Sequence, residues 1–382
     1  MKITDVHVRV FSYPSNTVRD QDGHTHPGET YEAKHALLTV VCDDGSEGYA
    51  LYNAEVIRPY IVNQMFRPVL IGRDPFQREK LWHELAHRQR GGGHQLTDHA
   101  LAAIELALWD LAGRKLGAPV RHLLGSYRDK APAYASTMVG DDMPGGLSSP
   151  EDYAAFAEAL VKQGYKGIKL HTWMPSGDLA PDPRRDVEAC AAVREAVGPD
   201  VALMLDAYHW YERTDALYLG RELQKLGFAW YEEPMEEASM SSYVWLSENL
   251  DIPVIGPETA MGKHHVRAEW AKSGACDILR SGVYDVGGIT PALKVAHLAE
   301  AFNMNCEIHG TGAGNLAVVC AIKNCIWYER GLLHPFLDYE TPPAYLNAID
   351  DPIDADGFVR ASNEPGLGVS INFDYIDNHL VG

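Results

Sequence analysis

Three carboxylates recur at equal spacing in the second half of the chain. The same interval of 26 residues separates Asp206 from Glu232 and Glu232 from Glu258. Each acid follows an apolar segment, VALML, GFAWY or IPVIGP, that is typical of a buried strand. The interval fits one strand-plus-helix unit. The three side chains are therefore predicted to end three adjacent parallel strands at the same height.

Carboxylates brought together in this way repel one another unless a cation neutralises them. A hard divalent ion with oxygen ligands, Mg²⁺ first, meets this need. A single acid at a strand end is more often a helix cap or a salt-bridge partner, but three at equal spacing favour a metal site. We therefore predict that Asp206, Glu232 and Glu258 bind Mg²⁺.

Strands and helices are predicted to alternate from about residue 131 onward. Repeated strand–helix units require a parallel sheet, and about eight of them favour a closed (β/α)₈ barrel. Active-site residues of such barrels lie at the C-terminal ends of the strands. The polar residues at those predicted ends are Lys169, His171, Asp206, Glu232, Glu258, His309 and Glu329.

The first part of the chain has a different pattern. Residues 3–12 alternate like a strand, and residues 36–42 run into a hairpin turn at Asp43-Asp44-Gly45. A helix is predicted to begin at Thr97 or Asp98 and to stop at Gly117. The tail after about residue 350 is expected to return to this unit. The predicted domains are residues 1–130, completed by 350–382, and a barrel over 131–349.

The composition narrows the class of protein. A formal net charge of −20 argues against a nucleic-acid or anionic-membrane partner, because both require clustered Lys and Arg. The six cysteines are scattered without a CxxC pair, and several lie in apolar stretches, which favours buried free thiols. The N-terminus lacks the apolar core of a signal peptide. We expect a cytoplasmic protein with a small-molecule substrate.

The order of motifs resembles that of a known enzyme family. LMLDA, YEEP and IGPET, followed by VGGIT and a later strand that ends in His, are similar to the mandelate racemase and acid-sugar dehydratase branch of the enolase superfamily. DDGSEGYA and EPGLG extend the likeness over nearly the whole chain. The resemblance implies an α/β fold, a modified (β/α)₈ TIM-type barrel with an α+β capping domain formed from both termini. It also implies Mg²⁺ held by Asp206, Glu232 and Glu258.

The resemblance further implies removal of the proton α to a carboxylate, with Mg²⁺ stabilising the enediolate. Many relatives carry Lys-x-Lys on the second barrel strand, where this chain has Lys169-Leu170-His171. His171 then takes the place of the basic Lys. Lys169 is expected to hold the substrate carboxylate or to lower the pKa of its neighbour. His209, just after the predicted ligand Asp206, remains an alternative base.

His309 lies where the resemblance places a second acid or base. Relatives of the racemase type pair this His with an Asp on the preceding strand, and Gly282 stands at that place here. We therefore expect the His–Asp dyad to be broken, although Asp285 follows three residues later. Glu329 matches the acid that hydrogen-bonds the substrate carboxylate, with a salt bridge to Arg330 or another local cation as the alternative.

The resemblance also places two loops of the capping domain over the barrel mouth, at about residues 24–31 and 51–55. His24 and His26 in the first loop suggest a second metal ion. A contact with substrate hydroxyls, or plain surface, is the favoured interpretation of these two residues.

Three functions remain open at this point. Polar residues dominate the predicted mouth, which favours dehydration of an acid sugar, an aldonate or aldarate, to a 2-keto-3-deoxy acid. A racemase, epimerase or lactone cycloisomerase on the same scaffold is the alternative, although a racemase needs competent bases on both faces and Gly282 weakens one of them. A non-catalytic metal-binding barrel protein is a third. A homo-oligomer is expected, because helix faces around such barrels usually associate.

Overall fold

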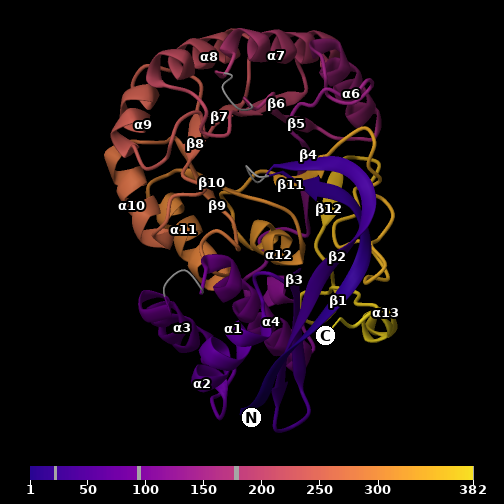
Figure 1. Cartoon of the computed structure of the whole chain (residues 1–382). Helices are drawn as coiled ribbons and strands as arrows, with labels where there is room; N and C mark the ends of the chain where they lie inside the picture. Colours follow the sequence, from indigo (N-terminus) through magenta and orange to yellow (C-terminus); the bar gives the residue numbers. More distant parts are fainter. Residues whose placement is uncertain (21–23, 93–95, 176–179, 382) are drawn as a thin grey trace.

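The computed structural model describes residues 1–20, 24–92, 96–175 and 180–381. Figure 1 shows a ring of helices around a curled sheet, with a smaller antiparallel sheet and its helices below it. The chain is thus of the α/β class, with an antiparallel capping sheet and a barrel-like parallel sheet, as predicted. Among the residues described, no helix is both long enough and apolar enough to cross a membrane.

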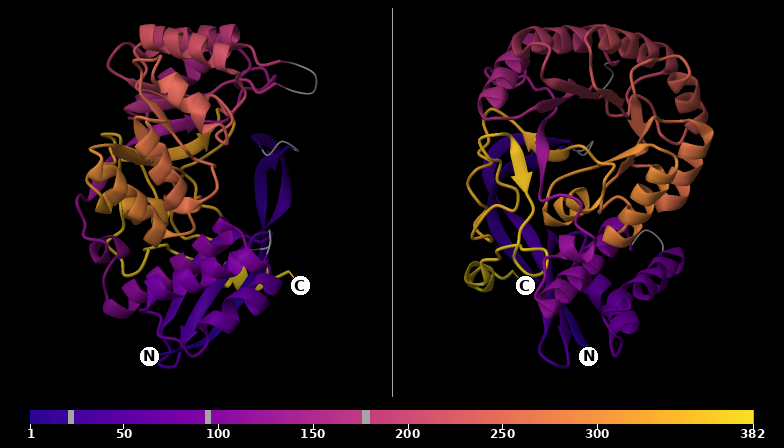
Figure 2. Two further views of the ribbon diagram at one scale, coloured as in Figure 1. Left: turned by 90° about the vertical axis from the view of Figure 1, so that its left-hand side faces the viewer. Right: turned by 180° about the vertical axis from the view of Figure 1, so that it is seen from behind.

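The capping sheet has three antiparallel strands in the order β1-β2-β3. They are β1 (Ile3–Arg19), β2 (Thr25–Cys42) and β3 (Glu47–Asn53). The turn between β2 and β3 lies at the predicted place, and Gly45 in it has a φ of 79°. β1 and β2 have 17 and 18 residues, so their far ends extend beyond β3. Figure 2 shows this hairpin rising from the sheet along one face of the barrel.

Helix α4 (Asp98–Leu116) lies between the capping sheet and the barrel, and it contacts both β3 and α11 (Ile289–Ala301). The Thr97 side chain caps its start by accepting from Ala100 N at 3.2 Å, and Gly117 ends it with a φ of 64°. The other helices of this part are α1 (Pro59–Ile61), η1 (Val62–Phe66), α2 (Arg67–Leu70), α3 (Arg78–Gly92) and α5 (Val120–Leu123).

Eight parallel strands form the second sheet, in the order β10-β9-β8-β7-β6-β5-β4-β11. Among the described residues, β10 and β11 at the two ends of this order do not pair, so the sheet curls without the full closure that the sequence favoured. Cys306 N of β10 instead donates to Asn324 O, which precedes β11, at 2.7 Å. The strands are β4 (Lys130–Thr137), β5 (Gly167–His171), β6 (Ala202–Asp206), β7 (Trp230–Glu232), β8 (Val254–Gly256), β9 (Ile278–Ser281), β10 (Asn305–Ile308) and β11 (Tyr328–Leu333).

Helices cover the outside of this sheet, which follows from the alternation of strands and helices in the sequence (Figure 1). They are α6 (Pro150–Lys162), α7 (Pro183–Val197), α8 (Arg213–Lys225), α9 (Met240–Ser247), α10 (Lys263–Ser273), α11 and α12 (Ala313–Ala321). The short strand β12 (Phe358–Arg360) pairs antiparallel with β4.

The C-terminal tail packs on the capping sheet. Ile371 and Ile376, the latter in α13 (Phe373–Asn378), form a small apolar cluster with Phe11 and Leu37. Val381 N donates to Val10 O at 2.9 Å. Both ends of the chain therefore lie at the same sheet (Figure 1).

One buried carboxylate joins the two parts of the molecule. Glu105 of α4 accepts from Ile289 N at 2.8 Å, from Thr290 N at 3.1 Å and from Trp109 Nε1 at 2.6 Å, and it is 1% exposed. The first N–H groups of a helix have no partner within that helix. Glu105 therefore caps α11, a helix of the other part.

We expect Glu105→Ala to lower the free energy of unfolding by about 3 kcal/mol or more, because each buried donor left unpaired costs about 1–3 kcal/mol. Glu79→Ala is the matched control. It removes an exposed ion pair to Lys294 between α3 and α11, and such pairs contribute about 0–1 kcal/mol. Denaturant unfolding followed by circular dichroism measures both. Equal losses in the two variants would contradict the capping role of Glu105.

Candidate active site

Lys169 and His171 lie on the same face of β5, two residues apart, with both side chains buried. The Nδ1 of His171 lies 2.7 Å from the carbonyl oxygen of Thr137. Since a carbonyl only accepts, Nδ1 must carry a hydrogen, and Nε2 is the ring nitrogen left to gain or lose a proton. Nε2 lies 3.0 Å from Asp206 Oδ2 and faces the other acids of the barrel.

The Lys169 ammonium lies among three carboxylates. Its Nζ is 3.3 Å from Asp206 Oδ2, 3.2 Å from Glu232 Oε2 and 3.0 Å from Glu329 Oε1. Burial acts to lower the pKa of Lys169, but Glu232 and Glu329 outweigh it and raise the pKa well above the usual value. Lys169 is therefore a fixed positive charge rather than a base at neutral pH.

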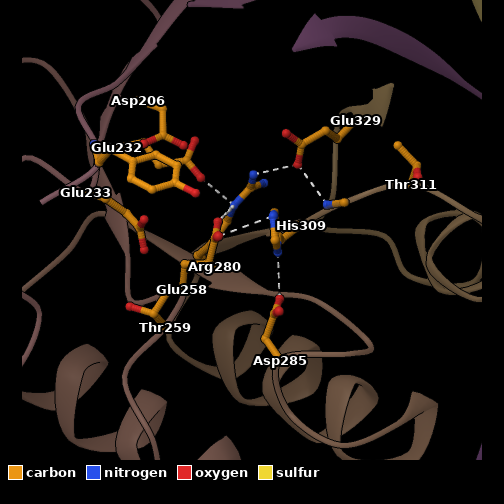
Figure 3. Close-up of polar contacts among 12 residues, drawn as sticks. Asp206, Glu232, Glu233, Glu258, Thr259, Arg280, Asp285, His309, Thr311 and Glu329 are labelled. Carbon is orange, nitrogen blue, oxygen red and sulfur yellow. Dashed lines mark hydrogen bonds and ion pairs between the residues drawn. The ribbon is translucent and has the colours of Figure 1, made fainter. Parts of the chain in front are cut away.

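The three predicted metal ligands end neighbouring strands. Asp206 and Glu232 are paired in register between β6 and β7, and Glu258 follows the end of β8 by two residues. Figure 3 shows Asp206 and Glu232 side by side. Glu232 is fully buried, and its Oε1 makes no hydrogen bond, although Arg280 Nε lies 2.6 Å away as an ion pair.

The donors present at this site fit a hard divalent cation. Three carboxylates supply oxygen ligands of the kind that Mg²⁺ prefers. Burial, with repulsion from Glu232 as a further cause, raises the pKa of Glu258 to about 8 despite the nearby His309 and Arg280. Glu233, also buried, has its pKa raised well above the usual value by burial and by Glu258. The cluster thus has more negative charge than its cations balance, and we propose that Asp206, Glu232 and Glu258 hold Mg²⁺.

Arg280 at the end of β9 belongs to this cluster, and the sequence analysis did not single it out. Its side chain is fully buried, and it contacts Glu232, Glu258 and Glu329, the last at 2.7 Å from Nη2. Figure 3 shows it in the middle of the acids. The signal was present, because Arg280 is the polar residue at the end of a predicted strand, as the other site residues are.

The His–Asp dyad is present, and the expectation that it is broken is wrong. His309, directly after β10, has its Nδ1 2.8 Å from Asp285 Oδ2 (Figure 3). Gly282 explains the difference. A Cβ at that position would lie 2.0 Å from Asp285 Oδ2, so the glycine leaves the space that this carboxylate fills. Burial would lower the pKa of His309, but Glu258 and Asp285 raise it to about 10.

Glu329 on β11 pairs with the two buried cations and not with Arg330. Its Oε1 lies 3.0 Å from Lys169, and its Oε2 accepts from Arg280 and from Gly310 N at 2.8 Å. Arg330 instead contacts Tyr165 and Glu340, each at 2.7 Å. Although burial acts against it, Lys169 and Arg280 hold the pKa of Glu329 well below its usual range. Its expected bond to a substrate carboxylate stays a prediction.

His209 pairs with an acid beside the cluster. Its Nε2 lies 3.1 Å from Glu233 Oε2, and its Nδ1 lies 3.3 Å from Met235 O. His171 likewise has both ring nitrogens facing protein oxygens, so these contacts do not separate the two candidates, and His209 stays an alternative base. The β1–β2 hairpin reaches this place too, where His24 packs against Tyr208 with ring centroids 4.8 Å apart.

Two family models cover most of this chain. Residues 13–125 match the N-terminal domain of mandelate racemase and muconate lactonizing enzyme, and residues 152–375 match the enolase C-terminal domain-like family. The chain belongs to the mandelate racemase/muconate lactonizing enzyme family of the enolase superfamily. The capping sheet and the acid-lined barrel mouth are therefore those of an enolase-superfamily enzyme.

Relatives in this superfamily include enzymes that act on acid sugars. A D-galactarolactone cycloisomerase from Agrobacterium fabrum is 31% identical over 89% of each chain. An arabinonate dehydratase from Saccharolobus solfataricus is 29% identical over 89% of this chain and 90% of its own. The crystal structure of D-glucarate dehydratase from Agrobacterium tumefaciens, complexed with magnesium, covers 100% of both chains at 61% identity with a TM-score of 0.98.

The ligand assignment predicts the effect of three isosteric variants. We expect Asp206→Asn, Glu232→Gln and Glu258→Gln each to weaken Mg²⁺ binding at least about 100-fold, because changes in the partners of a ligand alone cost about 10–100-fold. Glu212→Gln, which changes an exposed acid directly before α8, is the control. Isothermal titration calorimetry with Mg²⁺ measures the affinities. Unchanged affinity in two of the three variants would refute the assignment.

The dyad predicts a change in the pKa of His309. Without added Mg²⁺, Asp285→Asn should lower that pKa from about 10, because a carboxylate that favours the imidazolium is lost. Gly282→Ala should shift it in the same direction, since the new methyl displaces the Asp285 carboxylate. Gly91→Ala, where a Cβ meets nothing within 4 Å, should leave it unchanged. NMR titration of ¹⁵N-labelled histidines reports the values, and no shift in Asp285→Asn would contradict the coupling.

Proposed function

We propose that this protein is a Mg²⁺-dependent acid-sugar dehydratase whose substrate is an aldarate of the D-glucarate type. The observation that carries this proposal is a pair of imidazoles that each contact one predicted metal ligand. Nε2 of His171, at the end of β5, lies 3.0 Å from Asp206, and Nε2 of His309, directly after β10, lies 3.2 Å from Glu258. Full-length identity of 61% to a magnesium-bound D-glucarate dehydratase supports the choice of substrate class. The product of such a reaction is a 2-keto-3-deoxy acid.

His171 is assigned as the base. Its Nδ1–H donates to the carbonyl of Thr137, which orients the ring so that Nε2 faces the acids. Nε2 lies 3.0 Å from Asp206 Oδ2, a contact in which Nε2 carries a hydrogen. An ion bound by Asp206 would occupy that carboxylate, and Nε2, once free of its hydrogen, could then accept the proton α to the substrate carboxylate. The electron pair of the broken C–H bond is left on the substrate.

His309 is assigned as the acid. Its Nδ1 faces the Asp285 carboxylate at 2.8 Å, and a carboxylate in this place stabilises the imidazolium. The proton on Nε2 is then available to the β-hydroxyl, which leaves as water. The resulting enol converts to the keto acid, so the balance is the loss of one water from the substrate.

Developing charge on the substrate must be stabilised for a base of this strength to act. A divalent ion held by Asp206, Glu232 and Glu258 would supply this stabilisation as a Lewis acid. Lys169 and Arg280, fixed in place by their carboxylate partners, hold two further positive charges among these acids. Because they are already oriented, they need no rearrangement as the substrate charge changes.

A lactone cycloisomerase or a racemase is the second candidate. The intact His309–Asp285 dyad restores the second competent group that a racemase requires, and one relative is a D-galactarolactone cycloisomerase.

All six cysteines are buried free thiols, which fits a reducing compartment such as the cytoplasm. Association into a homo-oligomer stays a prediction.

Reaction of D-glucarate and related aldarates in D₂O with Mg²⁺ tests the assignment of roles. We expect wild-type protein to form keto acid. His309→Asn should lose keto-acid formation by about 10²-fold or more, yet still exchange the α-proton for deuterium, because the base remains. His171→Asn should lose both.

Gly91→Ala serves as the control for unchanged activity in this assay. Inversion or lactone ring opening without keto acid would move the assignment to the second candidate. Absence of every reaction across the aldarates, with Mg²⁺ bound, would refute the proposed substrate class.

A further inference from the structure

Two imidazoles and one carboxylate, groups of the kind that bind metal ions, lie close together at the far end of the β1–β2 hairpin. Asp20 Oδ2 is 3.2 Å from His24 Nδ1 and 2.9 Å from His26 Nε2. Among the described residues, Asp20, His24 and His26 are the one group of three His, Cys, Asp or Glu whose ligand atoms all lie within 4.8 Å of one another.

Strand pairing brings these three residues together. Arg19 pairs with Thr25, and Asp20 N donates to His24 O at 2.9 Å, so Asp20 lies opposite His24. His24 and His26 flank Thr25 and therefore lie on the same face of the hairpin. His24 N donates to Asp20 Oδ1 at 2.9 Å, which holds the carboxylate with its other oxygen near the two imidazoles.

The distances are close to those in a coordination sphere. In tetrahedral zinc sites the ligand bonds are about 2.0–2.1 Å, which places the ligand atoms about 3.3 Å apart. The two separations from Asp20 Oδ2, 3.2 and 2.9 Å, differ from this value by a few tenths of an ångström. An ion could therefore replace the shared hydrogens with small movements of the side chains.

The group is supported on one side and open on the other. The His24 side chain is only 5% exposed, because its ring packs on Tyr208 and lies 6.3 Å from the ring of Trp210. His26 and Asp20 are 27% and 34% exposed, which gives an ion a route of entry. Although burial acts to raise it, bonds from His26 and His24 lower the pKa of Asp20 to about 2, so the carboxylate is ionised at neutral pH.

We propose that Asp20, His24 and His26 form a second metal site, which binds a divalent ion of the zinc class. Two imidazole nitrogens and one carboxylate oxygen suit Zn²⁺, Co²⁺ or Ni²⁺, whereas Mg²⁺ prefers an all-oxygen set such as Asp206, Glu232 and Glu258. The two sites thus differ in the ion they select. An ion held by Asp20, His24 and His26 would lie near Tyr208, the residue two positions after Asp206. It would thereby stabilise the contact between the β1–β2 hairpin and the barrel mouth.

Titration of the untagged protein with Zn²⁺, in the presence of saturating Mg²⁺, tests this site by calorimetry. We expect one Zn²⁺ per chain in the wild type and at least about 100-fold weaker binding in His26→Gln and in Asp20→Asn. His83→Gln is the matched control, since it removes an exposed His that faces Glu79 at 3.2 Å. Asp206→Asn should lose Mg²⁺ and keep the hairpin site, so the result is independent of the proposed dehydratase activity.

A second readout places the ion. Bound Co²⁺ or Cu²⁺ quenches nearby tryptophans, so we expect quenching that His26→Gln abolishes and that Trp210→Phe reduces. Circular dichroism of each variant checks that it folds. The proposal would be overturned if the wild type bound no Zn²⁺. It would also be overturned if His26→Gln and Asp20→Asn both bound Zn²⁺ as tightly as the wild type.

Discussion

The barrel mouth places four carboxylates, the buried Asp206, Glu232 and Glu329 and the partly buried Glu258, around Lys169 and Arg280. Removing charges from water is costly unless each one finds a partner, and this balance constrains the rest of the mouth. The two cations occupy fixed places because each contacts several acids at once. These two cations do not balance all of the negative charge at the ends of β6, β7 and β8. A divalent ion there would balance the remainder.

The same balance separates the two imidazoles. His171 Nδ1 donates to a backbone carbonyl while its Nε2 faces Asp206, whereas His309 Nδ1 faces Asp285, and on this difference we propose opposite proton-transfer roles for the two side chains. This arrangement needs a rigid frame, because a shift of one residue in β5 would turn His171 away from the mouth. Pairing of β5 with β4 and β6 on both sides fixes that register.

Much of the fold was predictable from the sequence, because a strand-plus-helix repeat has few solutions. The equal spacing of Asp206, Glu232 and Glu258 predicted neighbouring strand ends, and the structure pairs the first two in register. Arg280 and the His309–Asp285 pair were missed for a physical reason. Alignment by position located Gly282, but it could not show that an empty volume there admits a carboxylate from another residue. Asp20 was missed because its contact with His24 and His26 depends on cross-strand pairing.

The position of Glu105 limits how the capping part and the barrel of related proteins can be exchanged in a chimera. The capping helix α4 carries the carboxylate that completes a barrel helix, and that helix follows directly on the loop that holds Asp285. The two parts are thus not interchangeable modules. A chimera that took its capping part from one relative and its barrel from another would have to inherit this acid with the matching helix start. Exchange at the boundary alone would disturb the loop that supports His309.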